Sequence, residues 1–273
     1  MDTKTITFCP LCSGSSGNST FVACGRTRIL VDCGTSGRHL EQCLHSIGID
    51  IRTINHILIT HAHTDHVQSA ALLSRRFNIP LHASIGTWKE MNRRDKTKGV
   101  ASKNIRIFKT GEVLLPIELG DLQAYFFPIP HDAPDPVGYR ITNGEQSVAV
   151  ATDLGHISPV LEQNLTGVSL LLLESNYDIP MLKNGPYPAE LKKRILGDHG
   201  HLSNNNAGEF AVKLIKSGTK EIMFGHLSKE NNRPDIAYQT VVNILQANAI
   251  TPQKDAEVFM ALRDTPSPVR KVS

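Results

Sequence analysis

One short loop constrains this chain more than any other feature. The segment INHILITHAHTDHVQS, residues 54–69, is an apolar, strand-like run followed by His61, His63, Asp65 and His66. In an extended loop side chains alternate with a period of two, so His61 and His63 point the same way. Asp65 and His66 fall at the turn into a helical pattern and face a second point. Imidazole and carboxylate groups suit Zn²⁺, Mn²⁺ or iron, so the loop predicts ligands for two adjacent metal ions.

Two coordination spheres need more ligands than one loop supplies, and the chain offers three further candidates. His131 opens HDAPDPVGY, Asp153 lies in ATDLGH, and His226 lies in GHLS. Each comes just after an apolar, strand-like run, where a turn can direct a side chain into a shared cleft. The repeated placement favours metal ligands over caps or surface residues.

The order of these residues resembles the metallo-β-lactamase superfamily over roughly residues 5 to 260. That resemblance implies an α/β fold, an αββα four-layer sandwich of two mixed β-sheets flanked by helices, with a dinuclear site at the sheet edge. It implies two divalent ions, Zn²⁺ or Mn²⁺ with iron as an alternative. One ion is expected at His61, His63 and His131, the other at Asp65, His66 and His226, with Asp153 bridging. Asp32, in RILVDCG, matches an early Asp that supports the metal loop from behind.

Within the superfamily the chain is most similar to the YycJ/WalJ-like group. The shared segments are SGSSGNS at 13–19, VDCG at 31–34, HDAPDPVGYRI at 131–141, LLLESNYD at 171–178, GHLSNNNAGEF at 200–210 and GHLSKENNRPDIA at 225–237. That resemblance implies a nuclease, including 5′→3′ exonuclease action on DNA, with DNA favoured over RNA as substrate.

Phosphodiester hydrolysis benefits from a general acid, because the leaving alkoxide is poor. The segment DHGHLSNN offers His199 and His201 just before a predicted helix. We assign the role of general acid to His201 and predict Asp65 as the other catalytic residue. His199 either orients His201 or is a surface residue. Ser203 lies at a helix N-terminus, which favours anions. Asn176 is a candidate phosphate contact or a turn cap.

The N-terminal segment FCPLCSGSSGNSTFVACG, residues 8–25, contains a Cys-x-x-Cys pair. A thioredoxin-like motif stands where a strand enters a helix, whereas a strand follows here. A zinc knuckle needs a second close pair, and a phosphate-binding Walker loop needs Gly-Lys-Ser/Thr. We therefore predict a hairpin whose small residues border the metal cleft, with Ser16 and Asn18 as substrate contacts and the cysteines as packing residues.

Organisation along the chain points to one domain over residues 1–262 and a flexible tail at 263–273. Strands are predicted at 6–11, 20–23, 28–31, 56–59, 122–127, 137–142, 147–151, 169–173 and 221–224. Helices are predicted at 38–46, 67–77, 85–92, 157–163, 189–196, 205–216 and 234–247.

Composition and the N-terminal sequence indicate where the protein is expected to act. No apolar run approaches the roughly 20 residues of a bilayer span, and the N-terminus lacks a signal-peptide pattern. We therefore expect a cytoplasmic protein without membrane association; its oligomeric state, including a homodimer, stays open. The net charge is +3, with basic runs at 88–109 and 191–194 that are either solvated faces or contacts for a phosphate backbone.

Several alternatives share the metal motif. A thioester or lactone hydrolase, or a hydrolase of small cyclic phosphodiesters, is compatible with it. An exported β-lactamase is disfavoured by the missing signal peptide, and a flavodiiron oxidoreductase by His63 where Glu is expected. A non-catalytic nucleic-acid-binding module with structural zinc would favour a closed, Cys-rich site.

Overall fold

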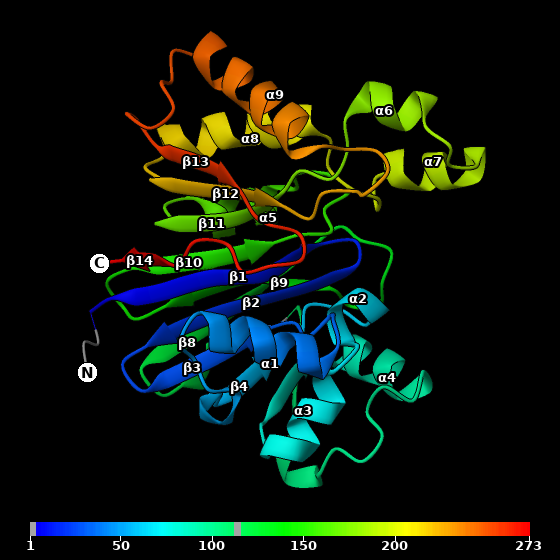
Figure 1. The fold of residues 1–273 in the computed structure, drawn as a ribbon, viewed down its shortest axis with the longest axis vertical. Coiled ribbons are helices and arrows are strands. Elements are labelled where there is room, and N and C mark those ends of the chain that lie inside the picture. Colours follow the sequence, from blue (N-terminus) through cyan, green and yellow to red (C-terminus); the bar gives the residue numbers. More distant parts are fainter. Residues whose placement is uncertain (1–3, 112–115) are drawn as a thin grey trace.

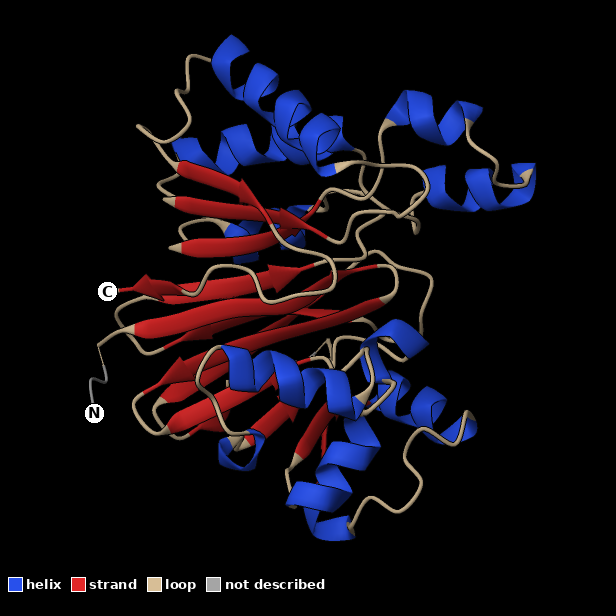
Figure 2. Ribbon diagram, viewed as in Figure 1, coloured by secondary structure: helices blue, strands red, loops and turns tan. Residues whose placement is uncertain are grey.

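Two seven-stranded sheets lie face to face in the computed structural model, which describes residues 4–111 and 116–273 (Figure 1, Figure 2). The first sheet contains β1 Ile6–Gly14, β2 Gly17–Cys24, β3 Thr27–Val31, β4 His56–Leu58, β5 Leu81–Ser84, β6 Ile105–Phe108 and β14 Arg270–Val272. The second contains β7 Ile117–Leu119, β8 Leu122–Pro128, β9 Val137–Thr142, β10 Ser147–Ala151, β11 Leu170–Glu174, β12 Glu221–Gly225 and β13 Glu257–Met260.

Both sheets are mixed in strand direction. The first runs β14-β1-β2-β3-β4-β5-β6, antiparallel up to β3 and parallel from β3 to β6. The second runs β13-β12-β11-β10-β9-β8-β7, parallel from β13 to β10 and antiparallel beyond. Parallel neighbours end at the same sheet edge, so the loops that follow β3, β4, β10, β11 and β12 can meet in one place.

Helices cover the outer face of each sheet. The first sheet packs against α1 Gly37–Ser46, α3 Ala70–Phe77 and α4 Ile85–Arg93, through buried side chains such as Leu40, Leu73 and Met91. The second packs against α5 Pro159–Leu165, α8 Asn204–Lys216 and α9 Pro234–Ala247. A third core, with Phe8, Val22, Phe126 and Tyr139, lies between the sheets. The predicted αββα four-layer α/β fold is therefore confirmed.

The predicted helix at 67–77 is wrong in one respect, because it is divided. A short helix, α2 Thr64–Val67, carries the metal loop and α3 follows separately. The break lies at Ser69, whose backbone N–H donates to the Cys33 carbonyl at 2.9 Å instead of continuing the helical ladder. This tertiary bond fixes α2 beside the loop that follows β3.

The flexible tail predicted at 263–273 is corrected by the structure. β14 pairs antiparallel with β1, with Ile6 opposite Val272. The backbone N–H of Ser267 donates to the Pro10 carbonyl at 2.9 Å, and the Ser267 hydroxyl accepts from Leu262 at 3.0 Å. The Pro- and Ser-rich composition suggested a frayed end, but the edge of β1 offers hydrogen-bond partners that order this segment. Within the described ranges, no helix has the length and apolarity needed to cross a bilayer.

Candidate metal centre

Three turns with unusual backbone conformations aim side chains into the space at the ends of the strands. Asp32 follows β3 with φ 64°, Asp153 follows β10 with φ 61°, and His226 follows β12 with φ 55°. Positive φ is uncommon for residues other than glycine and clusters at functional sites. All three side chains are buried. The backbone is thus bent at these positions to bring polar groups from both sheets together.

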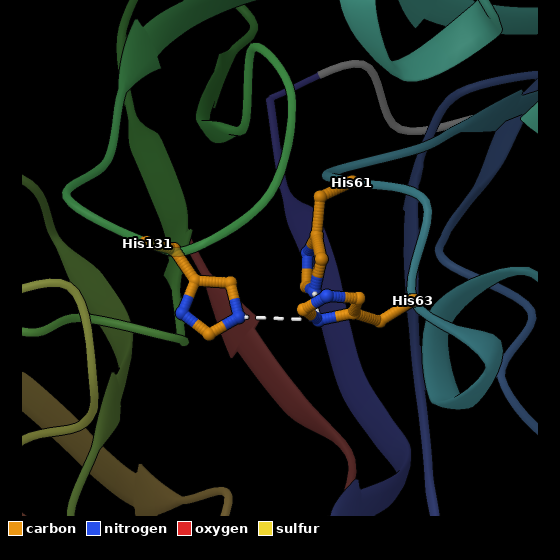
Figure 3. A group of neighbouring side chains, drawn as sticks. All are labelled: His61, His63 and His131. Atoms are coloured by element: carbon orange, nitrogen blue, oxygen red, sulfur yellow. Dashed lines mark hydrogen bonds between the residues drawn. The ribbon is translucent and has the colours of Figure 1, made fainter. Parts of the chain in front are cut away.

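His61, His63 and His131 form a three-histidine group (Figure 3). Nε2 of His61 lies 3.1 Å from Nδ1 of His63, and Nε2 of His131 lies 3.2 Å from that same nitrogen. Such separations resemble the roughly 3.3 Å between tetrahedral ligands whose bonds to zinc are about 2.0–2.1 Å. Burial lowers the pKa of all three imidazoles, which keeps them in the neutral form that binds metals.

Asp65, His66 and His226 form a second group, which we call the carboxylate-backed group. Oδ2 of Asp65 lies 3.5 Å from Nε2 of His66 and 3.8 Å from Nε2 of His226. Burial alone would lower the pKa of both imidazoles, but the neighbouring carboxylates, Asp153 foremost, raise it above the ordinary value.

Asp153 lies between the two groups. Its Oδ2 is 3.2 Å from Nε2 of His66, and its Oδ1 is 3.6 Å from Nε2 of His131 and 3.7 Å from Nε2 of His226. The structure therefore brings all of the sequence-predicted ligands into one cluster, with Asp153 between the two groups.

Two buried atoms of this cluster indicate that it fits metal ions. Oδ2 of Asp153 and Nε2 of His226 lack a hydrogen-bond partner among the described residues. A buried carboxylate oxygen without a partner is costly, by about 1–3 kcal/mol or more for a charged group. A divalent cation would satisfy both atoms, and the imidazole and carboxylate donors suit Zn²⁺ and Mn²⁺.

The loop after β3 supports the metal loop from behind. Nδ1 of His66 donates to Oδ2 of Asp32 at 2.7 Å, and Asp32 also accepts from the backbone N–H and the hydroxyl of Thr60. This contact fixes the His66 ring so that Nε2 points into the cluster. Gly34 packs so closely that a Cβ there would lie 1.5 Å from the Asp65 carbonyl oxygen. No side chain fits at that position while the metal loop stays in place.

Glu174, at the end of β11, is a functional candidate that the sequence analysis did not assign. Its carboxylate is fully buried and accepts from Nδ1 of His201 at 2.8 Å and from Nδ1 of His226 at 2.7 Å. The backbone N–H groups of Leu154 and Leu202 donate to its other oxygen. Burial opposes its charge, but His201 and the other partners lower the Glu174 pKa to about 2. One carboxylate thus orients both a candidate ligand and the candidate acid.

His201 stands beside the cluster rather than at the surface. Nδ1 of His201 is 3.9 Å from Oδ1 of Asp153, and its side chain is 20% exposed. Burial by itself lowers the His201 pKa, yet the charge and hydrogen bond of Glu174 raise it above the ordinary value. His199, the alternative acid, is exposed to solvent.

The predicted substrate contacts separate into two pairs. Asn176 and Asn18 are at the centre: Asn176 donates to the His226 carbonyl at 2.8 Å, and Nδ2 of Asn18 lies 3.1 Å from Nε2 of His66. Ser203 is buried and its hydroxyl caps α8, accepting from the Asn206 N–H at 3.1 Å. Ser16 is exposed, with its hydroxyl 3.4 Å from Asp264. Ser16 and Ser203 are therefore not brought together with the ligands.

The five cysteines are buried free thiols. Burial raises the pKa of Cys9 and Cys12, the Cys-x-x-Cys pair on β1, to about 12. A thiol with so high a pKa is a poor nucleophile and a poor ligand at neutral pH. This agrees with packing roles for both residues.

Comparison with known proteins places the chain in a family. The model of the beta-lactamase superfamily domain matches residues 27–226. Exodeoxyribonuclease WalJ of Streptococcus pneumoniae serotype 2 is 34% identical over 262 residues, 96% of each chain. Exodeoxyribonuclease YycJ of Bacillus anthracis is 33% identical over 239 residues, 88% of this chain and 89% of that one.

A solved structure gives the same assignment at the level of the fold. The metallo-β-lactamase fold protein YhfI from Bacillus subtilis aligns with a TM-score of 0.71 at 15% identity, over 98% of this chain and 100% of that chain. The matched family model, the two relatives and the αββα sandwich agree with one another. The chain belongs to the metallo-β-lactamase superfamily, in the same group as WalJ and YycJ.

Proposed function

We propose that this protein is a dinuclear metal-dependent nuclease that hydrolyses phosphodiester bonds of DNA from a chain end, in the 5′→3′ direction. The observation that carries the proposal is that the two ligand groups and the candidate general acid lie next to one another. Asp153 lies 3.2–3.7 Å from histidines of both ligand groups, and the Glu174–His201 pair lies beside that same carboxylate. Relatives that match nearly the whole chain are named exodeoxyribonucleases, which supports DNA as the substrate.

The ligand groups would hold two divalent ions, Zn²⁺ or Mn²⁺. Such ions supply a nucleophile at neutral pH and positive charge that offsets the phosphoryl oxygens. Asp65 has a role besides binding: although burial opposes its charge, His66 and His226 hold its pKa well below the usual range. The carboxylate therefore stays ionised near neutral pH, and we assign it to accept a hydrogen bond from the attacking water rather than to take up a proton.

His201 would protonate the leaving oxygen. Its Nδ1 is committed to Glu174, so Nε2 is the nitrogen left to face a substrate. The raised pKa keeps the imidazole protonated to a higher pH than a free histidine, as a general acid requires. After transfer, the buried Glu174 carboxylate continues to hold the neutral ring by its Nδ1–H.

The enzyme would act in the cytoplasm, where the five free cysteines would stay reduced.

The proposal is tested with purified protein on single-stranded DNA and RNA of one sequence, labelled at either end, with Mn²⁺ and with Zn²⁺. We expect metal-dependent loss of nucleotides from the 5′ end of DNA, at a higher rate than from RNA. No metal-dependent cleavage of either polymer, together with turnover of thioesters or lactones, would overturn it.

A further inference from the structure

A cavity of about 160 Å³ adjoins the metal centre on the side of His201. Its polar wall comes from three loops, at Ser15 between β1 and β2, Asn176 after β11 and Ser228 after β12. Its other wall is formed by Tyr187, just before helix α7 Ala189–Leu196, and by Arg194 within that helix. The cavity therefore lies between the candidate acid, His201, and helix α7.

The outer wall is a helical hairpin made of α6 Ile179–Asn184 and α7, which stands out from the sandwich beside the second sheet (Figure 1). The hairpin has a small core of its own, with Tyr177, Leu182 and Ile195 buried. The backbone N–H of His201 donates to the Ile195 carbonyl at 3.0 Å, which links α7 directly to the segment that carries the candidate acid. The wall is thus fixed relative to the reacting groups.

The groups in this cavity match a nucleotide. Arg194 forms an ion pair with Asp132, whose Oδ1 lies 3.4 Å from Nε2 of His131. The Arg194 side chain is still 57% exposed, so its guanidinium retains donors for a phosphate oxygen. Tyr187 is half-buried and offers a ring on which a base can stack. Hydroxyl and amide groups on the opposite wall can bind a sugar.

The size of the cavity restricts what it encloses. Cavities that enclose drug-sized ligands measure roughly 300–1,000 Å³, and this one measures about 160 Å³. It can therefore take one nucleotide unit in part, but not a continuing strand. We propose that the cavity binds the terminal nucleotide of the substrate, and that the α6–α7 hairpin makes hydrolysis start at a chain end. This inference rests on the proposed nuclease function.

The experiment compares Tyr187→Ala and Arg194→Ala with the wild-type protein on linear single-stranded DNA. Arg76→Ala is the matched control, because Arg76 is an ion-paired arginine with a 58% exposed side chain that lines a different cavity. We expect each cavity variant to raise KM for linear DNA by about 10-fold, as the loss of base stacking or a phosphate contact would. For Tyr187→Ala, the rate on bis(p-nitrophenyl) phosphate, which has no terminal nucleotide, should change far less than the KM for linear DNA does.

Two further measurements separate recognition from misfolding. Tyr187→Phe retains the ring and should behave like the wild type. Thymidine 5′-monophosphate should inhibit the wild type competitively and inhibit Tyr187→Ala about 10-fold less. Circular single-stranded DNA should be cut far more slowly than linear DNA.

The inference is overturned if the wild type cuts circular and linear DNA equally, or if both cavity variants keep the wild-type KM and inhibition. Unchanged KM and inhibition in the cavity variants would leave the nuclease proposal standing, because DNA would still be hydrolysed from its ends. Equal cutting of circular and linear DNA would also remove the chain-end part of that proposal. Absence of any metal-dependent DNA cleavage by the wild type would overturn both.

Discussion

The two ligand groups of the centre differ in what supports their histidines. In the three-histidine group the supporting atoms are neutral: Thr60 Oγ1 lies 3.1 Å from Nδ1 of His61, and the Gly200 carbonyl lies 3.3 Å from Nδ1 of His131. In the carboxylate-backed group, by contrast, each histidine donates its Nδ1–H to a buried carboxylate, from Asp32 or Glu174.

This difference has a chemical consequence. A carboxylate behind an imidazole fixes the ring and makes it a more basic ligand, and it adds negative charge near a bound cation. We therefore expect the carboxylate-backed group to hold its ion more tightly than the three-histidine group. Asp153 lies close to histidines of both groups, so substitutions there and in the supporting residues test whether the two groups differ in this way.

The largest effect is expected from Asp153→Asn. Asparagine tolerates the positive φ of this position, so the change removes mainly the shared charge. Metal content should fall in both groups, and activity should fall by more than the roughly 100-fold that a supporting residue can cost. Elemental analysis and the DNA assay measure both. A variant that keeps two ions and wild-type turnover would show that Asp153 does not bridge.

His201→Ala should follow closely, with turnover reduced by about 10²–10⁴-fold, the range for loss of a general acid. Metal content should not change, because all seven predicted ligand positions are intact and Nδ1 of His201 donates to Glu174. Loss of metal in this variant would mean that His201 is a ligand, and the assignment of the acid would be wrong.

Glu174→Gln and Asp32→Asn test the supporting carboxylates against each other. Each should weaken metal binding in the carboxylate-backed group by about 10–100-fold. Only Glu174→Gln should also lower turnover at saturating metal, since Glu174 contacts His201 as well as His226. Chelator titrations and rates at saturating Mn²⁺ distinguish the two effects. Equal turnover in both variants would show that Glu174 does not support His201 as the general acid.

The smallest effect is a shift in the pH profile. His201 acts when protonated, so activity should be lost as pH rises through its pKa, which Glu174 holds above the ordinary value of about 6.5. In Glu174→Gln burial still lowers that pKa, and the more distant Asp153 carboxylate is the remaining group that raises it. The alkaline limb of the kcat profile should therefore move to lower pH. An unchanged limb would assign it to another group.

Much of the fold follows from local patterns. The predicted boundaries of Val137–Thr142 and Pro234–Ala247 agree with the structure, because alternating or helix-periodic apolar residues define them. β5, β6 and β13 were not predicted; each is only a short run whose strand form depends on pairing with distant neighbours. β14 is the extreme case, since its three residues are a strand only beside β1.

The site shows a similar division. The spacing of the metal loop and the strand-end positions of His131, Asp153 and His226 were enough to anticipate the cluster. Glu174 was missed because it ends the buried run LLLLE, and its importance depends on partners that are remote in sequence. Ser15, not Ser16, lines the cavity. In a hairpin turn neighbouring side chains diverge, so one residue decides which faces the centre.

The most direct test of the account is to count and locate the metal ions. A crystal of the protein loaded with Mn²⁺ or Zn²⁺, measured at the metal absorption edge, should show two anomalous peaks per chain. One should lie among His61, His63 and His131, the other among Asp65, His66 and His226, with Asp153 between them. A single ion, or ions bound outside these two groups, would contradict the account.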